Sequence, residues 1–217
     1  ASWPQLGSDG VWVPWLQDVG AQVAPLVPAN CGFDVSPVWS QHLRTRFAGA
    51  PIKPVVLRVG DAFEPTFDRQ GEFVLSAYGI EGSLVYAASA LIRDAIATNG
   101  NATIILDLLP DHDAARVQRE VAHPRGSRSL GSHLKSRLGL EGAKVALLHE
   151  LLPREVIADA SRLAPAIKAL PITLAAPRPI AAYSSNLLGS LVGIALFDAA
   201  TLARTPPWLW FLVAGPG

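Results

Sequence analysis

The sequence lacks the sulfur-containing residues that often point to a class of protein. It has no methionine, and Cys31 is the only cysteine among 217 residues. One cysteine excludes an internal disulfide and a Cys-x-x-Cys zinc site, and it is typical of a reducing compartment. Ala1 comes first, and no basic stretch with an apolar core follows it. We therefore expect a cytoplasmic chain without a signal peptide that is an internal piece or a processed product.

The glycines do not form the patterns that bind phosphate groups. Eighteen are present, yet only Gly215 and Gly217 lie two positions apart, so Gly-x-Gly-x-x-Gly does not occur. That turn lets backbone amides approach the diphosphate of a dinucleotide where a strand leads into a helix. A Walker loop and a Gly-x-Ser-x-Gly nucleophile turn are also missing. The chain alone therefore lacks a dinucleotide site, and its sequence identifies neither a catalytic residue nor a small-molecule substrate.

Neither sign of charge is in excess. Lys and Arg number 18, as do Asp and Glu, so we expect no nucleic-acid partner. One segment is locally basic, with Glu120 as its single acid: Arg116, Arg119, Arg125, Arg128, Lys135 and Arg137. It lacks interleaved aromatic residues for base stacking, so we interpret it as a solvated helical surface, with a phosphate- or nucleic-acid-binding face as the alternative. Asp111, His112 and Asp113 are adjacent and point in three directions, so no metal site is predicted.

Long apolar runs are also scarce. The two strongest, 187–197 and 208–215, are separated by charged residues and a Pro-Pro pair, and each is shorter than the roughly 20 residues of a spanning helix. We therefore predict no membrane span. Apolar surface of this extent seldom stays bare, so docking of a partner chain, or self-association, through 187–213 is the alternative to an enzymatic role.

The pattern of apolar residues predicts an α+β fold, with a small β-rich domain and a helical subdomain. Strands are expected at 53–59, 72–78, 103–109 and 172–176, with turns at 60–61 and 69–71. Helices are expected at 11–19, 39–47, 83–99, 113–122, 130–138, 143–152 and 160–170. Asp9 and Ser83 are the expected N-caps of the first and third helices, Asn99-Gly100 ends the third, and Pro165 kinks or restarts the last.

Several segments taken together resemble a family of flavoproteins. They are Ala1–Gly10, Pro28–Phe33, Glu72-Phe73 with Tyr78-Gly79-Ile80-Glu81-Gly82-Ser83, Arg125–Leu130 and Ala166–Pro171. They resemble FAD/NAD(P)-dependent oxidoreductases of the aminoacetone oxidase-like kind. In that family a fold that binds two dinucleotides is interrupted by a β-rich domain and a small helical domain. The resemblance covers roughly 1–179, and the family's flavin-binding glycine segments are missing or divergent here.

The resemblance implies a division of the chain and a cofactor. Residues 1–25 would be a remnant of the FAD-binding domain, 26–110 with 171–180 the β-rich insert, 111–170 the helical subdomain, and 181–217 a divergent apolar segment. The implied function is part of a flavin-dependent oxidoreductase, NAD(P)-linked in the family, that retains little FAD as an isolated chain. The residues implied near the cofactor are Gly7, Ser8, Gly10, Gly82 and Ser83, and the alternative for the last two is an ordinary helix cap.

Overall fold

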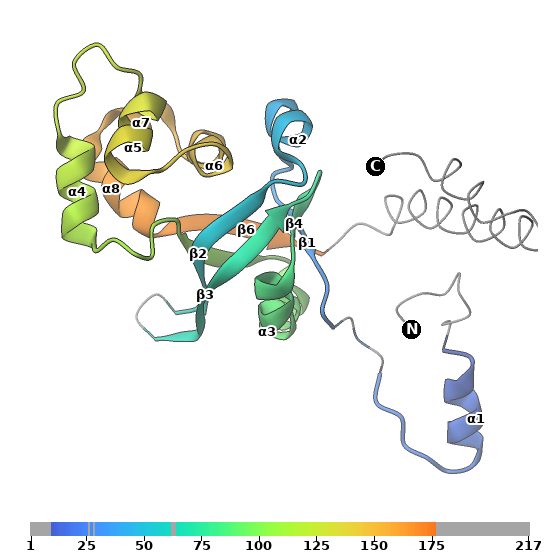
Figure 1. Cartoon of the computed structure of the whole chain (residues 1–217). Helices are drawn as coiled ribbons and strands as arrows, with labels where there is room; N and C mark the ends of the chain where they lie inside the picture. The colour runs from blue at the N-terminus through green and yellow to red at the C-terminus, as the bar shows by residue number, and fades with distance from the viewer. Residues whose placement is uncertain (1–9, 26, 28, 62–63, 177–217) are drawn as a thin grey trace, which may run out of the picture. The chain divides into compact units, whose positions relative to one another are not determined.

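The computed structural model describes residues 10–25, 27, 29–61 and 64–176. Within them, strands and helices combine into an α+β fold (Figure 1), as predicted. Residues up to Ala176 form one compact unit. The apolar segment 187–213, on which the docking alternative rests, lies outside the described residues.

The strands of the described residues form a closed antiparallel barrel in the order β1-β4-β3-β2-β5-β6, and β6 pairs back onto β1. They are β1 (Phe33–Val35), β2 (Pro51–Gly60), β3 (Pro65–Leu75), β4 (Gly79–Glu81), β5 (Ala102–Asp107) and β6 (Leu170–Ala175). Closure pairs the backbone groups that an open sheet leaves free at its edges. The first and last strands meet where Asp34 pairs with Ala175.

The core of the barrel follows from alternating apolar residues. On β6, Leu170, Ile172 and Leu174 are buried while the residues between them are more exposed, which is the period of two expected of a strand with one face inside. On β2 this alternation shifts, because the pairing with β3 has an irregularity between Ile52 and Val55. The bulge places Lys53 and Pro54 on the exposed side.

Two helices lie directly on the barrel. α2 (Gln41–Phe47) begins at Ser40, whose hydroxyl accepts a hydrogen bond from the amide of Leu43. α3 (Ser83–Asn99) is the longest helix of the described residues and buries Leu84, Val85, Ala88, Ser89 and Ile92. It ends at Gly100, which has a φ of 80° and donates its amide to the carbonyl of Ile96. The predicted glycine stop is therefore confirmed.

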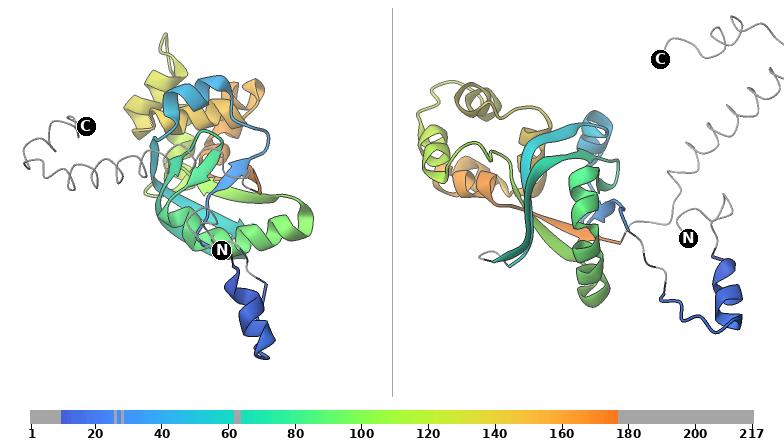
Figure 2. Two further views of the ribbon diagram at one scale, coloured as in Figure 1. Left: turned by 90° about the vertical axis from the view of Figure 1, so that its right-hand side faces the viewer. Right: turned by 60° about the horizontal axis from the view of Figure 1, so that its bottom comes forward.

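The remaining helices gather on another side of the barrel (Figure 2). They are α4 (Ala114–Ala122), α5 (Leu130–Leu138), α6 (Ala143–Leu151), α7 (Arg154–Ala158) and α8 (Ala160–Lys168), and we call them the helical subdomain. The N-cap of α4 is Asp113, whose carboxylate accepts a hydrogen bond from the amide of Arg116. Buried residues of these helices, such as Leu134 and Ile167, belong to the same apolar cluster as the barrel core.

Several sequence predictions need correction. The turn expected at 69–71 lies inside β3, where Arg69 and Gln70 are exposed residues paired with β2. The chain reverses after Gly60, where the other turn was predicted. Pro165 lies inside α8, which runs from Ala160 to Lys168, so the helix is not restarted there. Ser83 is not the N-cap of α3, because Gly82 holds that position. The elements β1, β4 and α7 were not predicted, since three to five residues are too few to show a period.

The α1 helix (Trp12–Asp18) is apolar, yet none of its residues is buried. The predicted apolar side is present, with Trp12, Leu16 and Val19 exposed. Its N-cap is Val11, which makes no side-chain capping bond, and Asp9, the predicted cap, lies outside the described residues. None of the helices in the described ranges combines the length and the apolar character needed to cross a bilayer.

Candidate functional site

The turn from β4 into α3 contains the Tyr78–Ser83 segment, and its two glycines are required by the fold. A β-carbon at Gly79 would lie 1.8 Å from the carbonyl oxygen of Phe33, because β1 and β4 approach closely there. Gly82 has a φ of 116°, a conformation that residues with a β-carbon rarely adopt. The spacing of these glycines therefore reflects strand packing and the entry into α3.

The N-terminus of α3 presents backbone amides without a side-chain cap. Gly82 offers no capping side chain, and the first turn contains no acidic residue. A helix of 17 residues carries a partial positive charge at this end, and its first amides have no partner within the helix. Ser83 is exposed here. This arrangement is chemically suited to accept an anion, including a phosphate of a cofactor.

The structure brings together two of the five residues predicted to lie near a cofactor. Gly82 and Ser83 are adjacent at the start of α3. Gly10 precedes α1, and its carbonyl accepts from the amide of Val13 at 2.9 Å. Gly7 and Ser8 lie outside the described residues. Gly79 was missed as a critical residue, although a glycine inside a strand pattern is a signal of close backbone approach.

Cys31 is a free, half-buried cysteine beside α3. The amide of Asn30 next to it donates to the hydroxyl of Ser89 on α3 at 3.1 Å. Burial raises the pKa of the Cys31 thiol, against the opposing effects of its backbone hydrogen bond and of Arg93. Because the nucleophilic form is the thiolate, the raised pKa of Cys31 opposes a role as a nucleophile.

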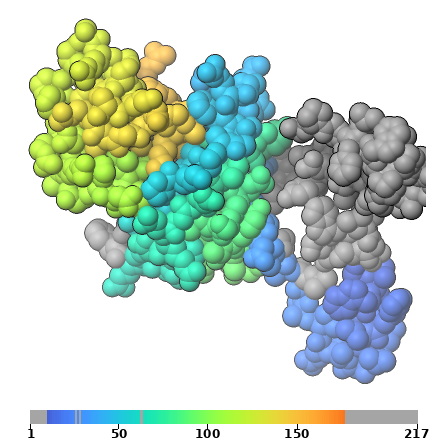
Figure 3. All heavy atoms as spheres, in the orientation of Figure 1, coloured from blue at the N-terminus to red at the C-terminus, as the bar shows by residue number. Residues whose placement is uncertain are grey.

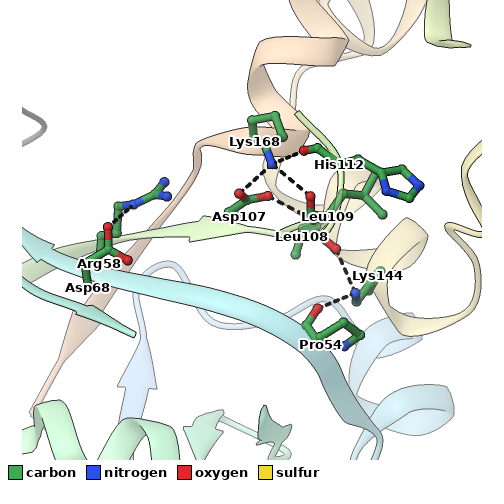
Figure 4. A network of polar contacts seen from close by, with 9 residues as sticks. All are labelled: Pro54, Arg58, Asp68, Asp107, Leu108, Leu109, His112, Lys144 and Lys168. Carbon is green, nitrogen blue, oxygen red and sulfur yellow. Dashed lines mark hydrogen bonds and ion pairs between the residues drawn. The ribbon is translucent and has the colours of Figure 1, made fainter. Parts of the chain in front are cut away.

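A second polar cluster lies at the connection from β5 to α4 (Figure 4). We call residues 107–112 of this connection the joint. The Nζ of Lys168, at the end of α8, lies 2.7 Å from Oδ2 of Asp107. It also donates to the carbonyl oxygens of Leu109 at 2.8 Å and His112 at 2.5 Å. The other oxygen of Asp107 accepts from the amide of Leu109 at 2.9 Å. A buried carboxylate is thus fully paired.

Lys144 of α6 binds the other side of the joint. Its Nζ donates to the carbonyl oxygens of Pro54 at 2.6 Å and Leu108 at 2.7 Å. Burial lowers the pKa of Lys144, and the nearby carboxylates of Asp107 and Asp111 oppose that effect. A cavity of about 360 Å³ lies beside this lysine, between β2, the joint and α6.

A larger groove of about 740 Å³ lies between α2, α5 and α6. Its apolar side chains include Phe47 and Val145. At one end Glu150 of α6 accepts hydrogen bonds from the amide of Ser40 at 2.5 Å and from its hydroxyl at 2.6 Å. Figure 3 shows α2 (light blue) against the helical subdomain (yellow) at this contact. The groove therefore lies between α2 and the helical subdomain.

The basic segment of the sequence is partly neutralised by its neighbours. Arg119 and Arg137 both form ion pairs with Glu120, and Lys135 pairs with Glu141 at 2.5 Å. Burial raises the pKa of Glu120, but the hydrogen bond and charge of Arg137, aided by Arg119, bring it below its usual value. Among the described residues, no group of three or more His, Cys, Asp or Glu side chains is placed to hold a metal ion.

Comparison with known proteins gives the family. No curated protein matches the chain. Residues 27–183, however, match the family model described as the HI0933-like protein barrel and H2TH domain. The match covers all the strands of the barrel and all the helices of the helical subdomain. The chain therefore belongs to the HI0933-like family of flavoproteins, which are FAD-dependent oxidoreductases.

Proposed function

We propose that the chain supplies the β-rich and helical inserts of a flavin-dependent oxidoreductase and retains little or no FAD when isolated. One observation carries this proposal. All strand pairs of the described barrel are antiparallel, whereas dinucleotides bind at the carboxyl ends of parallel strands, beside a glycine-rich turn. The described residues contain no such unit. The dinucleotide-binding fold would then come from sequence outside these residues.

In this proposal the inserts cover the flavin and shape the access of the substrate. FAD, when bound, supplies the redox chemistry, and the protein supplies position and electrostatics. Residues 1–25 would belong to the FAD-binding domain, with Gly7, Ser8 and Gly10 beside the cofactor. Gly82 and Ser83 would place the backbone amides at the N-terminus of α3 close to the cofactor. The absence of a side-chain cap and of first-turn acids there fits an anionic group. The aminoacetone oxidase-like specificity and a link to NAD(P) are part of the proposal.

The test is to purify the chain and measure its flavin content from the visible absorbance and the released FAD. We expect far less than one FAD per chain, and no saturation when FAD is added at micromolar concentration in equilibrium dialysis. Stoichiometric FAD that co-elutes with the isolated chain would overturn the proposal, because the chain would then contain a complete site.

A pair of variants tests the role given to the start of α3. Ser83→Asp places a carboxylate at the helix N-terminus, where it occupies the free amides and repels an anion. Ala90→Asp adds the same charge to an exposed position further along α3 and is the control. We expect Ser83→Asp to weaken residual FAD binding at high FAD concentration and Ala90→Asp to leave it unchanged. Equal effects of the two variants on FAD binding would show that Gly82 and Ser83 do not belong to the cofactor site.

A further inference from the structure

The helical subdomain is joined to the barrel by two stretches of chain that lie side by side. The chain leaves the barrel through the joint, between β5 and α4, and returns from α8 into β6 through Ala169. The amide of Leu108 in the first stretch donates to the carbonyl of Ile167 at the end of α8, at 3.0 Å. Any rotation of the subdomain on the barrel must therefore change the joint.

Lys168 ties these two stretches to each other. It is the last residue of α8, so its backbone lies on the returning stretch. Its ammonium group lies within hydrogen-bond distance of three oxygens from the outgoing stretch: Oδ2 of Asp107 and the carbonyls of Leu109 and His112. An ammonium has three donors, so the three N–H groups and the three oxygens match in number.

Lys144 ties the same joint to a different part of the barrel. Its backbone lies in α6, and its ammonium joins the carbonyl of Leu108 to that of Pro54 in β2. Pro54 and Leu108 belong to segments 54 residues apart in the chain. The carbonyl groups of an irregular connection lack hydrogen-bond partners from a helix or a sheet. Here two lysines of the helical subdomain donate the hydrogen bonds.

Three of the five residues that these lysines bind, Asp107, Leu108 and Leu109, are buried, so water poorly replaces the lysines there. Asp107 is 3% exposed, and an ionised carboxylate in that position needs a charged or hydrogen-bonded partner. In the joint, one carboxylate oxygen and three carbonyl oxygens are bound by lysines of the helical subdomain, which favours one conformation of this connection. Toward the other end of α6, Glu150 accepts hydrogen bonds from Ser40 in the α2–α6 groove.

We propose that Lys144 and Lys168 form a clasp that sets the angle of the helical subdomain on the barrel and thereby the width of the α2–α6 groove. The apolar core shared by the two parts holds them together, but apolar contact is not directional. Directional attachment comes from hydrogen bonds, and at the joint the two lysines donate most of them, in addition to the bonds from Ser40 to Glu150. Without them the subdomain tilts about its two connecting stretches while both parts stay folded.

The experiment measures the angle of the subdomain directly. In the full-length chain, with Cys31 replaced by serine, spin labels are attached at Gln70→Cys on β3 and Ala115→Cys on α4, both exposed positions. The wild-type distance distribution should be a single narrow peak. Lys168→Met and Lys144→Met should each broaden or shift it. Hydrogen exchange of the Leu108 amide, which bonds across the two stretches, should become about tenfold faster or more.

The control is Lys135→Met, which removes a lysine from an ion pair within the helical subdomain and should change neither measurement. Lys168→Arg keeps the charge and the donors, so it should fall closer to wild type than Lys168→Met does. Should Lys168→Met fail to fold, Lys144→Met provides the same readout. An unchanged distance distribution and unchanged Leu108 exchange in the folded variants would overturn the clasp.

Discussion

Gly79 and Gly131 show how differently two glycines of this chain constrain its sequence. A β-carbon at Gly79 would overlap the carbonyl oxygen of Phe33, while a β-carbon at Gly131, in the first turn of α5, meets nothing within 4 Å. We expect Gly79→Ala to cost about 3 kcal/mol or more of unfolding free energy, since β1 must move away from β4. Urea denaturation measures this.

The control for that change is Gly131→Ala. Alanine is the better helix former, and the position is not in the left-handed region, so the variant should be as stable as wild type or more stable, by up to about 1 kcal/mol. Equal stability of Gly79→Ala and wild type would show that the close approach of β1 and β4 is not required.

Glu120 provides a prediction about pH. In the folded chain its pKa lies below the ordinary value of a glutamate. The contribution of Glu120 to stability is therefore present above the pKa of the unfolded chain and is lost as the pH falls through the pKa of the folded chain. Arg137→Met removes the partner that lowers this pKa, while the burial that raises it remains. We expect the pKa of Glu120 to rise, as measured by NMR titration of the side-chain carboxyl.

Arg116→Met is the matched control, because it removes an exposed arginine of the same segment that forms no ion pair with Glu120. The pKa of Glu120 should stay close to its wild-type value in this variant. A wild-type pKa of Glu120 in Arg137→Met would mean that the ion pair between α4 and α5 does not form in solution.

Among the helices, α2 depends on a residue from another part of the chain. In a capping box a Glu three residues after the N-cap binds the N-cap amide, but α2 has Leu43 at that position. Glu150 of α6 binds the amide of Ser40 instead. We expect Glu150→Ala to destabilise the chain by about 1–2 kcal/mol and to speed hydrogen exchange at the start of α2.

Glu141→Ala is the comparison for Glu150→Ala. Glu141 pairs with Lys135 in an exposed ion pair, which contributes about 0–1 kcal/mol, and its loss should leave exchange in α2 unchanged. If both variants change α2 equally, the capping role of Glu150 is refuted.

The longer elements were predictable because each carries its own pattern. The α3 helix has an apolar face, a glycine stop and 17 residues, and most helices of the helical subdomain begin at a capping residue or follow a glycine or proline. β1 and β4 have three residues each and exist because closure of the barrel pairs them. The residues at 69–71 suggest a turn, but they lie inside a long hairpin, in which Arg69 and Gln70 are exposed and paired with β2.

The two candidate sites also differ in how well the sequence predicts them. Gly82 and Ser83 stand out in the sequence because a glycine and a serine precede a long apolar helix. The clasp has no such signal. Its bonds join lysine side chains to backbone carbonyls 36 to 90 positions away, and every residue type has a carbonyl. Only the folded chain brings these groups together.

For the whole chain, the exposure of α1 leads to a prediction about truncation. No residue of α1 is buried, so removal of residues 1–25 should change the unfolding free energy by no more than about 0.5 kcal/mol. Truncation through Val35 also removes β1, whose partners β4 and β6 would lose their pairing. We expect this second variant to unfold at a much lower urea concentration. A large loss on removal of 1–25 alone would contradict the prediction.

The pairing of Asp34 with Ala175 places the beginning and the end of the barrel next to each other. A unit with adjacent ends can be joined by a short linker and opened elsewhere. The exposed residues Gly100 and Asn101, between α3 and β5, are suitable for the new termini. A circular permutant of residues 29–176 cut at this point should therefore keep the same barrel, which makes the unit a practical carrier for grafting into loops of unrelated proteins.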